Sequence, residues 1–260
     1  MTEETVETLY LLGEQDRIAG ISGFTVRPPE ARKEKPKVSA FTSAKIPKIL
    51  ELNPDLVLGF SDLQADIAAE LIKHGIEVYV FNQRTVAGIL RMIRTLGRLV
   101  NAAEKADALA DSYQDRIDRI QADVANWQHR PTVYFEEWYD PAISGIGWVS
   151  ELIEIAGGVD CYVENAKHQG AAKRIIADPL EIAARRPDII IGSWCGKRFH
   201  PDKVKERPGW EEVPAVLNDE IYEIKSAYIL QPGPAAVTEG LDQLAAITSS
   251  WYRRFHQADS

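Results

Sequence analysis

This chain of 260 residues lacks several features that define common classes of protein. It has only two cysteines, Cys161 and Cys195, so a disulfide framework is excluded and we expect two free thiols. Its formal net charge of −9 argues against nucleic acid or an anionic membrane as a partner. No apolar run reaches the roughly 18 residues of a membrane-spanning helix, so we expect no direct membrane insertion.

Signals for a metal site or a phosphate loop are also lacking. No two of the five histidines have metal-ligand spacing, which predicts no protein-built metal site. The runs at 145–147 and 157–158 are rich in glycine but lack the strand-loop-helix context of a phosphate-binding loop. We therefore expect no built-in cofactor.

What the sequence does contain is a repeated strand. Residues 49–61 and 182–194 share a Pro-Asp pair, three aliphatic residues and a glycine, and they lie about half the chain apart. A strand that is apolar on both faces indicates a parallel sheet covered on both sides. A glycine at its carboxyl end marks the place where open α/β sheets bind ligands. The repeat predicts an α/β protein of two Rossmann-like lobes with parallel-rich sheets, facing one ligand cleft.

The segment over residues 102–127 has no glycine or proline and carries a narrow apolar stripe, which predicts one long helix. We expect an N-terminal lobe over 1–100, a linking helix over 101–128 and a C-terminal lobe over 129–260. The other predicted elements fall into three groups. Helices are expected over 2–12, 44–52, 62–74, 85–100, 148–156, 179–184 and 234–255, with the first amphipathic and capped by Thr2. Strands are expected over 16–22, 38–41, 56–58, 77–81, 132–135, 189–191 and 220–224, and loops over 23–36 and 136–147.

The two halves differ at their beginnings. In the second half the strand over 132–135 precedes the first helix, whereas the first half starts directly with the helix over 2–12. A lobe without its central strand would leave backbone groups of two neighbouring strands unpaired. We therefore expect a further segment ahead of Met1, and an export signal could belong to it.

Aromatic residues follow many of the predicted strands. Together they favour a wide apolar cleft for a large flat ligand, whereas Trp127, Trp210 and Trp251 fit structural positions. The candidate ligand-binding aromatics are Phe24, Phe41, Phe60, Trp138, Trp148, Trp194 and Tyr228.

A second class of function, an enzyme, would use polar residues at the same strand ends. Glu136 and Glu137 could do acid/base work, but neighbouring strand residues point to opposite faces, so at most one faces the cleft. Cys195 lies near Lys197 without a histidine at triad-like spacing. We therefore assign Glu137 and Cys195 to ligand binding and expect no catalytic residues; an enzyme using Glu136 or Glu137 with Cys195 is the alternative.

The order and spacing of these motifs resemble a known family. The resemblance is carried by residues 16–29, 49–59, 75–76, 151–158, 186–192 and 208–223. It is to the periplasmic substrate-binding proteins whose two α/β lobes are joined by one long helix, and which serve ABC importers of vitamin B12, haem and ferric siderophores. The cobalamin-binding members are the most similar.

This resemblance implies a monomeric, non-enzymatic protein that binds a corrinoid or similar large metal chelate and delivers it to an ABC permease. Aromatics of such members match Phe41, Phe60 and Trp194 by position. Haem or a ferric siderophore is the alternative ligand, the latter because Arg27, Arg84 and Lys197 are present. The acids that would dock on the permease are Asp66 or Glu70 in one lobe and Asp178 or Glu181 in the other.

The resemblance also implies residence in the periplasm or at the cell surface. Residues 1–13 are acidic and helical in pattern, and they contain no signal peptide. A cytoplasmic chelate carrier or sensor on the same fold is therefore a further alternative.

Overall fold

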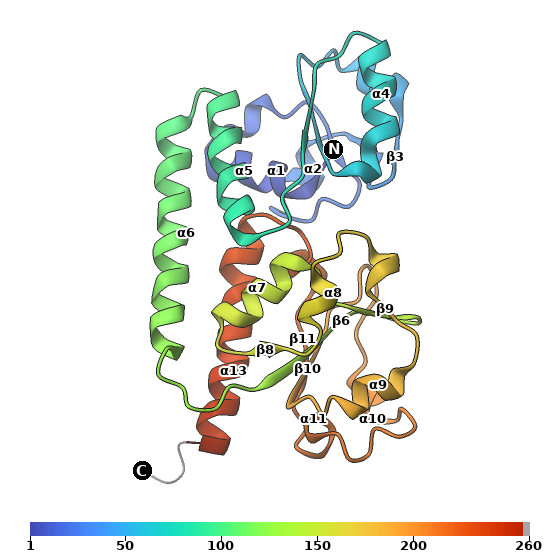
Figure 1. The fold of residues 1–260 in the computed structure, drawn as a ribbon. Helices are drawn as coiled ribbons and strands as arrows, with labels where there is room; N and C mark the ends of the chain where they lie inside the picture. The colour runs from blue at the N-terminus through green and yellow to red at the C-terminus, as the bar shows by residue number, and fades with distance from the viewer. Residues whose placement is uncertain (257–260) are drawn as a thin grey trace. The chain divides into compact units, whose positions relative to one another are not determined.

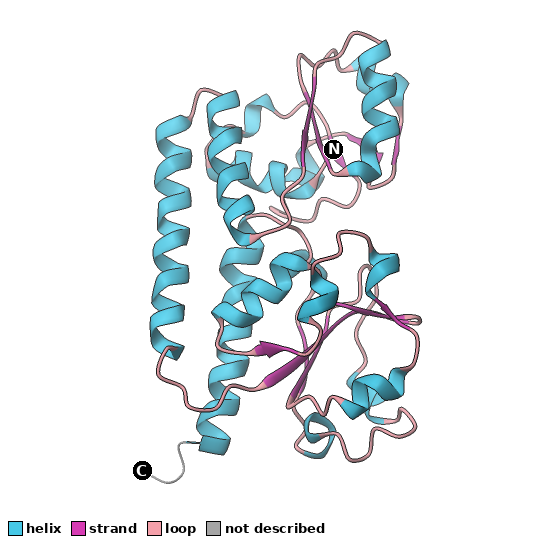
Figure 2. Cartoon of the chain, in the orientation of Figure 1, coloured by secondary structure: helices cyan, strands magenta, loops and turns pink. Residues whose placement is uncertain are grey.

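The computed structural model describes residues 1–256, and its chain divides into two compact units. Unit 1 consists of Met1–Gln83 with Ala87–Ser112, and unit 2 of Arg84–Val86 with Tyr113–Ser260. Figure 1 traces the chain, and Figure 2 shows that helices and strands alternate in both units. No helix within the described residues has both the length and the apolar character needed to cross a bilayer.

Unit 1 holds two small sheets. In one, β1 pairs with β2 in parallel and β2 with β3 in antiparallel orientation; in the other, β4 and β5 are parallel. The strands are β1 (Ile21–Ser22), β2 (Lys37–Ala40), β3 (Ser43–Ala44), β4 (Val57–Phe60) and β5 (Val78–Phe81). The helices are α1 (Glu3–Leu11), α2 (Ala31–Glu34), α3 (Ile46–Glu51), α4 (Ala65–Lys73) and α5 (Val86–Leu99).

Unit 2 is built on one six-stranded sheet in the order β11-β10-β6-β7-β9, with β8 also paired to β6. Strands β6, β8, β10 and β11 run parallel, which confirms the predicted parallel-rich α/β fold. The strands are β6 (Thr132–Tyr139), β7 (Ala142–Ser144), β8 (Val159–Asp160), β9 (Ile175–Ile176), β10 (Ile189–Gly192) and β11 (Ile221–Glu223). The helices are α7 (Gly147–Ile155), α8 (Val163–Ala166), α9 (Pro179–Ala184), α10 (Pro201–Lys205), α11 (Pro214–Leu217), α12 (Ser226–Ile229) and α13 (Leu241–His256).

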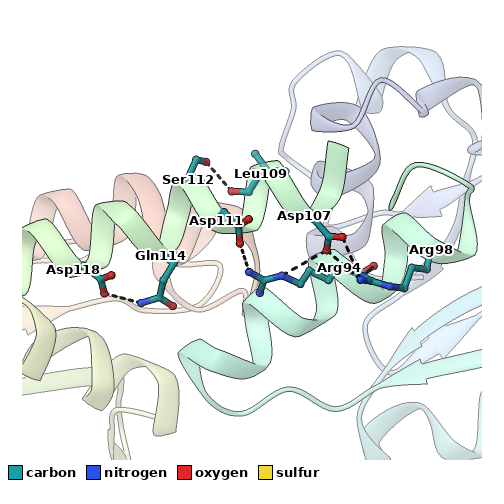
Figure 3. A network of polar contacts seen from close by, with 8 residues as sticks. All are labelled: Arg94, Arg98, Asp107, Leu109, Asp111, Ser112, Gln114 and Asp118. Carbon is teal, nitrogen blue, oxygen red and sulfur yellow. Dashed lines mark hydrogen bonds and ion pairs between the residues drawn. The ribbon is translucent and has the colours of Figure 1, made fainter. Parts of the chain in front are cut away.

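The long helix predicted at mid-chain is present as α6 (Ala103–Val124), whose 22 residues span about 33 Å. It pairs with α5 through Gly97, where an added Cβ would lie 2.1 Å from the Cβ of Ala106. Arginines of α5 bind acids of α6 along the same contact, as Figure 3 shows: Arg94 reaches Asp111 at 2.6 Å and Arg98 reaches Asp107 at 3.2 Å. Close backbone approach and exposed ion pairs thus fix this pair of helices.

The predicted loop over 136–147 is wrong. Strand β6 continues to Tyr139, and β7 returns antiparallel to it, with Glu136 opposite Ser144 and Trp138 opposite Ile143. The segment forms a hairpin because β7 supplies backbone hydrogen-bond partners for the end of β6. The acidic and aromatic side chains of this stretch do not reveal that pairing. The strand predicted over 16–22 is also mostly wrong, because a 3-10 turn occupies Gln15–Arg17 and only Ile21–Ser22 pairs.

Helix α1 is present but is not amphipathic. Polar side chains of its first two turns are buried together with the apolar ones, among them Glu3, Glu4 and Thr8. Thr2 does not cap the helix through its side chain; its hydroxyl lies 2.9 Å from the hydroxyl of Thr5. The face predicted to meet solvent is therefore buried.

Candidate functional site

A buried ion pair lies in the second half of β6, at Glu136. Glu136 is fully buried, and Arg207 donates to its two carboxylate oxygens at 2.7 and 2.8 Å. The indole Nε1 of Trp194 and the phenol of Tyr134 donate to the same carboxylate, each at 3.0 Å. Burial, with the nearby Glu136 charge, raises the pKa of Tyr134 well above its usual range. With both oxygens of Glu136 engaged, its role in this structure is to position Arg207 and Trp194.

The neighbouring acid points the other way, as strand geometry predicts. Glu137 Oε1 accepts a hydrogen bond from Arg174 Nη2 at 3.2 Å, and the guanidinium of Arg174 is almost completely buried. Arg174 also donates to the carbonyl of Ser144 on β7. Glu137 is half-buried, so this pair presents a neutralised polar group at the strand end rather than a free carboxylate.

Aromatic rings lie side by side at the same end of the sheet. Tyr139 is 4.5 Å from Trp194 and 5.3 Å from Trp138, measured between ring centroids. The ammonium of Lys197 lies 4.8 Å from the Trp138 ring centroid and 3.2 Å from the Tyr139 hydroxyl. We call these four residues the aromatic cluster: Trp138, Tyr139, Trp194 and Lys197.

The glycine of the repeated strand makes this arrangement possible. Phe199 lies edge-on to Trp194, with 5.0 Å between centroids. Its ring lies against Gly192 so closely that an added Cβ would be 1.9 Å from a ring carbon. A glycine at the end of β10 thus lets the following loop fold back and bring Trp194 and Lys197 to the strand ends.

The other predicted ligand-binding aromatics differ in exposure. Phe60 and Trp148 are core side chains, 4% and 3% exposed, and Trp148 donates its Nε1–H to the carbonyl of Ile229. Phe24 follows β1 and is 59% exposed, while Phe41 follows β2 and is half-buried. Tyr228, on α12, is also half-buried. In this structure Phe60 and Trp148 have almost no exposed ring face to offer a ligand, and the same holds for Trp194 of the aromatic cluster, which is also 4% exposed.

The expected structural tryptophans occupy structural positions. Trp210 is completely buried, Trp251 is 7% exposed, and Trp127 stacks on Tyr252 with 4.3 Å between ring centroids.

The two cysteines are both free thiols, as expected. Cys195 is exposed in the loop after β10. Cys161 directly follows β8, and burial raises the pKa of its thiol to about 12. Among residues 1–256 no three His, Cys, Asp or Glu side chains are grouped as a metal site would require.

The acids considered for permease docking lie on two helices, one in each unit. On α4, Asp66 is exposed, and Glu70 forms an ion pair with Lys73 at 3.2 Å and lies 3.4 Å from the Nε2 of His74. On α9, Asp178 caps the helix by accepting from the Leu180 N–H at 2.9 Å. Glu181, one turn on, pairs with Arg185 at 3.1 Å.

Three residues of this region were missed by the sequence analysis. Tyr139 fell in the predicted loop, although it directly follows Trp138 in the same strand. Arg174 and Arg207 are 37 and 71 residues from their glutamate partners, and no local pattern marks them.

Comparisons with known proteins agree with this architecture. A family model described as periplasmic binding protein matches residues 1–228. An uncharacterized ABC transporter substrate-binding lipoprotein of Bacillus subtilis is 26% identical over 248 residues, covering 92% of this chain and 75% of its own length. A vitamin B12-binding protein of Vibrio campbellii is 23% identical over 236 residues, covering 89% of this chain and 82% of its own length.

Solved structures show the same fold. The periplasmic vitamin B12-binding protein of Vibrio cholerae superposes with a TM-score of 0.79 at 19% identity, covering 97% of this chain and 96% of that one. A periplasmic haem-binding protein of Roseiflexus sp. RS-1 gives a TM-score of 0.79 at 20% identity, with 96% and 95% coverage. Because the family model spans most of the sequence, the chain belongs to the periplasmic binding protein family.

Proposed function

We propose that this chain binds a corrinoid, or a similarly large and flat metal chelate, and hands it to an ABC permease. It is a substrate-binding protein of the vitamin B12, haem and siderophore type, and several of its relatives are named as vitamin B12-binding proteins. The family is one of binding proteins, which supports a carrier rather than an enzyme. In line with the family, we place the protein in the periplasm or at the cell surface, acting as a monomer.

The aromatic cluster carries the proposal. Trp138 and Tyr139 are half-buried, so each offers part of a ring to a ligand, and the Lys197 ammonium lies beside both. Apolar rings with few polar groups suit a large planar ligand. The lysine adds a donor for a phosphate or carboxylate at the ligand's edge. A corrinoid with its nucleotide phosphate has both features.

The second candidate ligand is haem, because the aromatic cluster contains or borders side chains of the kinds that bind haem iron. The Tyr139 hydroxyl and the exposed imidazole of His200 belong to the groups that bind haem iron. The His200 ring lies 6.4 Å from Trp194, so it borders the same cluster. Replacing His200 or Tyr139 would remove an iron ligand but would leave stacking on Trp138 available.

Titration with cobalamin, haemin and a ferric siderophore, followed by tryptophan emission and calorimetry, tests the proposal. We expect one-to-one binding of cobalamin at micromolar concentrations or below. Tight haemin binding with a Soret shift that His200→Ala or Tyr139→Phe abolishes would instead favour the haem carrier. If none of the three ligands binds at micromolar concentrations, the proposal is wrong.

Two further points belong to the same proposal. Asp66 or Glu70 on α4 and Asp178 or Glu181 on α9 would dock on basic residues of the permease, and Asp66→Lys should reduce uptake without changing ligand affinity. The enzyme alternative would need Cys195 and a carboxylate of β6; turnover that disappears in Cys195→Ala would support it. A cytoplasmic carrier would be recognised by cell fractionation.

A further inference from the structure

Unit 2 contains a groove that is separate from the aromatic cluster. Its volume is about 570 Å³, which is within the range of sites that hold a small ligand. Helices α7 and α8, which are neighbours in the fold, form two of its walls (Figure 1). The residues that line the groove all belong to unit 2 and differ from the four of the aromatic cluster. The groove is therefore a second candidate site within one unit.

Three segments meet at one end of the groove, around Gly147, the first residue of α7. A Cβ added to Gly147 would lie 2.7 Å from the carbonyl oxygen of Arg84 and 3.4 Å from that of Ala166. One turn along α7, the carboxylate of Glu151 accepts from the N–H of Val86 at 2.6 Å. This end of the groove is thus formed by close backbone packing and is held by a hydrogen bond.

Part of the groove lining is apolar. Ile146, Ile155 and Ala166 are buried there, whereas Val163 of α8 is 50% exposed. A half-exposed valine beside buried aliphatic side chains gains free energy when a ligand covers it. The groove therefore favours a ligand that carries an apolar part.

The acids in and beside the groove already have donors of their own. Glu151 accepts from the backbone at Val86, and Glu154 forms an ion pair with Arg130 at 3.2 Å. Glu164 of α8 forms an ion pair with Arg185 at 2.7 Å. These carboxylates do not require a cationic ligand to satisfy them.

The donors of the groove differ in this respect. Across residues 1–256, the ammonium of Lys167 and the imidazole of His168 enter no hydrogen bond or ion pair, and both side chains are exposed. Arg84 lines the same end, because its backbone and that of Ala166 both lie against Gly147. Basic side chains thus gather at one groove in a chain whose net charge is −9. A ligand that matches them brings a negative charge and acceptor oxygens.

We propose that this groove binds a small amphipathic anion, that is, a phosphate or carboxylate joined to a short apolar chain. The anionic head would lie at the end bordered by Lys167 and His168, and the apolar chain would cover Val163. A soluble organic acid and the headgroup region of an anionic lipid both have this chemistry. The site is independent of the proposed chelate binding, so it stands or falls separately.

Calorimetric titration of the whole chain with hexyl phosphate, inorganic phosphate and hexanol tests both parts of the assignment. Hexyl phosphate should bind at millimolar concentrations or below. Inorganic phosphate lacks the apolar chain and hexanol lacks the charge, so each should bind at least about tenfold more weakly. Equal binding of hexanol, or no binding of hexyl phosphate at millimolar concentrations, would overturn the proposal.

Variants of the basic end locate the anion. Lys167→Gln and His168→Gln should each weaken hexyl phosphate binding by about threefold, as expected for exposed charged contacts. Lys173→Gln is the matched control, because this lysine is also exposed but does not line the groove. Melting temperatures would check that the variants fold. Hexyl phosphate binding that is unchanged in both groove variants would overturn the proposal.

A variant of the apolar lining locates the chain of the ligand. Val163→Ser should weaken binding of hexyl phosphate but not of inorganic phosphate. Leu217→Ser on α11, where the leucine is 60% exposed and outside the groove, should alter neither. A loss of binding in Lys197→Gln with none in Lys167→Gln would place hexyl phosphate at the aromatic cluster and would overturn the proposal.

Vesicles distinguish the two sources of the anion. Sedimentation with phosphatidic acid vesicles, but not with phosphatidylcholine vesicles, would assign the site to a lipid headgroup if Lys167→Gln reduces it. Hexyl phosphate binding without sedimentation on either vesicle would assign it to a soluble anion.

Discussion

Arg207 and Glu136 form a bidentate ion pair in which the carboxylate is completely buried and the guanidinium is only 16% exposed. The two residues come from the loop after α10 and from β6, and the same carboxylate accepts from the indole of Trp194. The pair therefore fixes one ring of the aromatic cluster in its orientation. Breaking it should affect both stability and the proposed ligand site.

Removing the arginine should be costly. Arg207→Met leaves the Glu136 charge buried beside Trp194 and Tyr134 only, and loss of one partner of such a pair costs about 3–5 kcal/mol. Urea unfolding would measure this loss. In the double variant Glu136→Gln with Arg207→Met, no buried charge is left, so stability should recover by at least half. If the double variant is as unstable as Arg207→Met, the loss does not come from the unpaired charge.

The contact of Gly192 with Phe199 predicts a steric effect with a specific rescue. Gly192→Ala would place its Cβ 1.9 Å from the Phe199 ring, so the ring must move and stability should fall by about 1–3 kcal/mol. Gly192→Ala combined with Phe199→Ala should lose less than the sum of the two single variants, as thermal unfolding would show. Gly170→Ala, which would meet no atom within 4 Å, is the matched control.

Buried acids in α1 predict that stability depends on pH. Burial raises the pKa of Glu4 from 4.5 to about 7, and it raises the pKa of Glu3 as well. The unfolded chain thus releases these protons near pH 4.5, whereas the folded chain keeps the Glu4 proton until about pH 7. Stability should fall by about 3 kcal/mol for Glu4 as the pH rises across this window.

The contribution of Glu4 can be isolated with a single variant. Unfolding free energies of the wild type and of Glu4→Gln, measured from pH 4.5 to 8, give that contribution as their difference. The exposed control Glu77→Gln should leave the profile unchanged. A flat wild-type profile below pH 7 would contradict a buried, protonated Glu4.

Trp138 is the residue whose removal should best report ligand stacking, because Trp194 also supports Glu136. Trp138→Ala should weaken binding of the ligand found by titration by roughly 1–3 kcal/mol. Trp127→Ala, which removes a ring that stacks on Tyr252 and packs against Gly157, should leave the dissociation constant unchanged. An unaltered affinity in Trp138→Ala would exclude this ring from the site.

The parts of the fold that could be predicted from sequence are those with a local cause. Strands β4 and β10 were predicted because they are apolar on both faces, and α6 because it has no helix breaker between residues 102 and 127. The hairpin β6–β7 was missed because its pairing joins an acidic, aromatic stretch to a partner beyond Pro141. Hydrophobic periodicity does not register a strand whose side chains are mostly polar or aromatic.

The candidate site was harder to predict than the fold. Trp138 and Trp148 look alike in sequence, yet one lies in the aromatic cluster and the other binds Ile229 in the core, 81 residues away. The exposure of a side chain depends on which distant segments of the chain cover it. Glu136 can be buried because Arg207 pairs with it, and no local sequence pattern marks Arg207 as its partner. The sequence therefore predicted the strand ends at which ligand residues gather but not which side chains are accessible there.

Neither unit is one continuous piece of chain. The chain passes from one unit to the other after Gln83, after Val86 and again after Ser112. The last of these points lies inside α6. A genetic exchange at the last of these points would cut a helix into two pieces, each too short to be stable in isolation. Recombination between relatives would therefore tend to preserve the whole chain, and the two copies of the repeated strand would be inherited together.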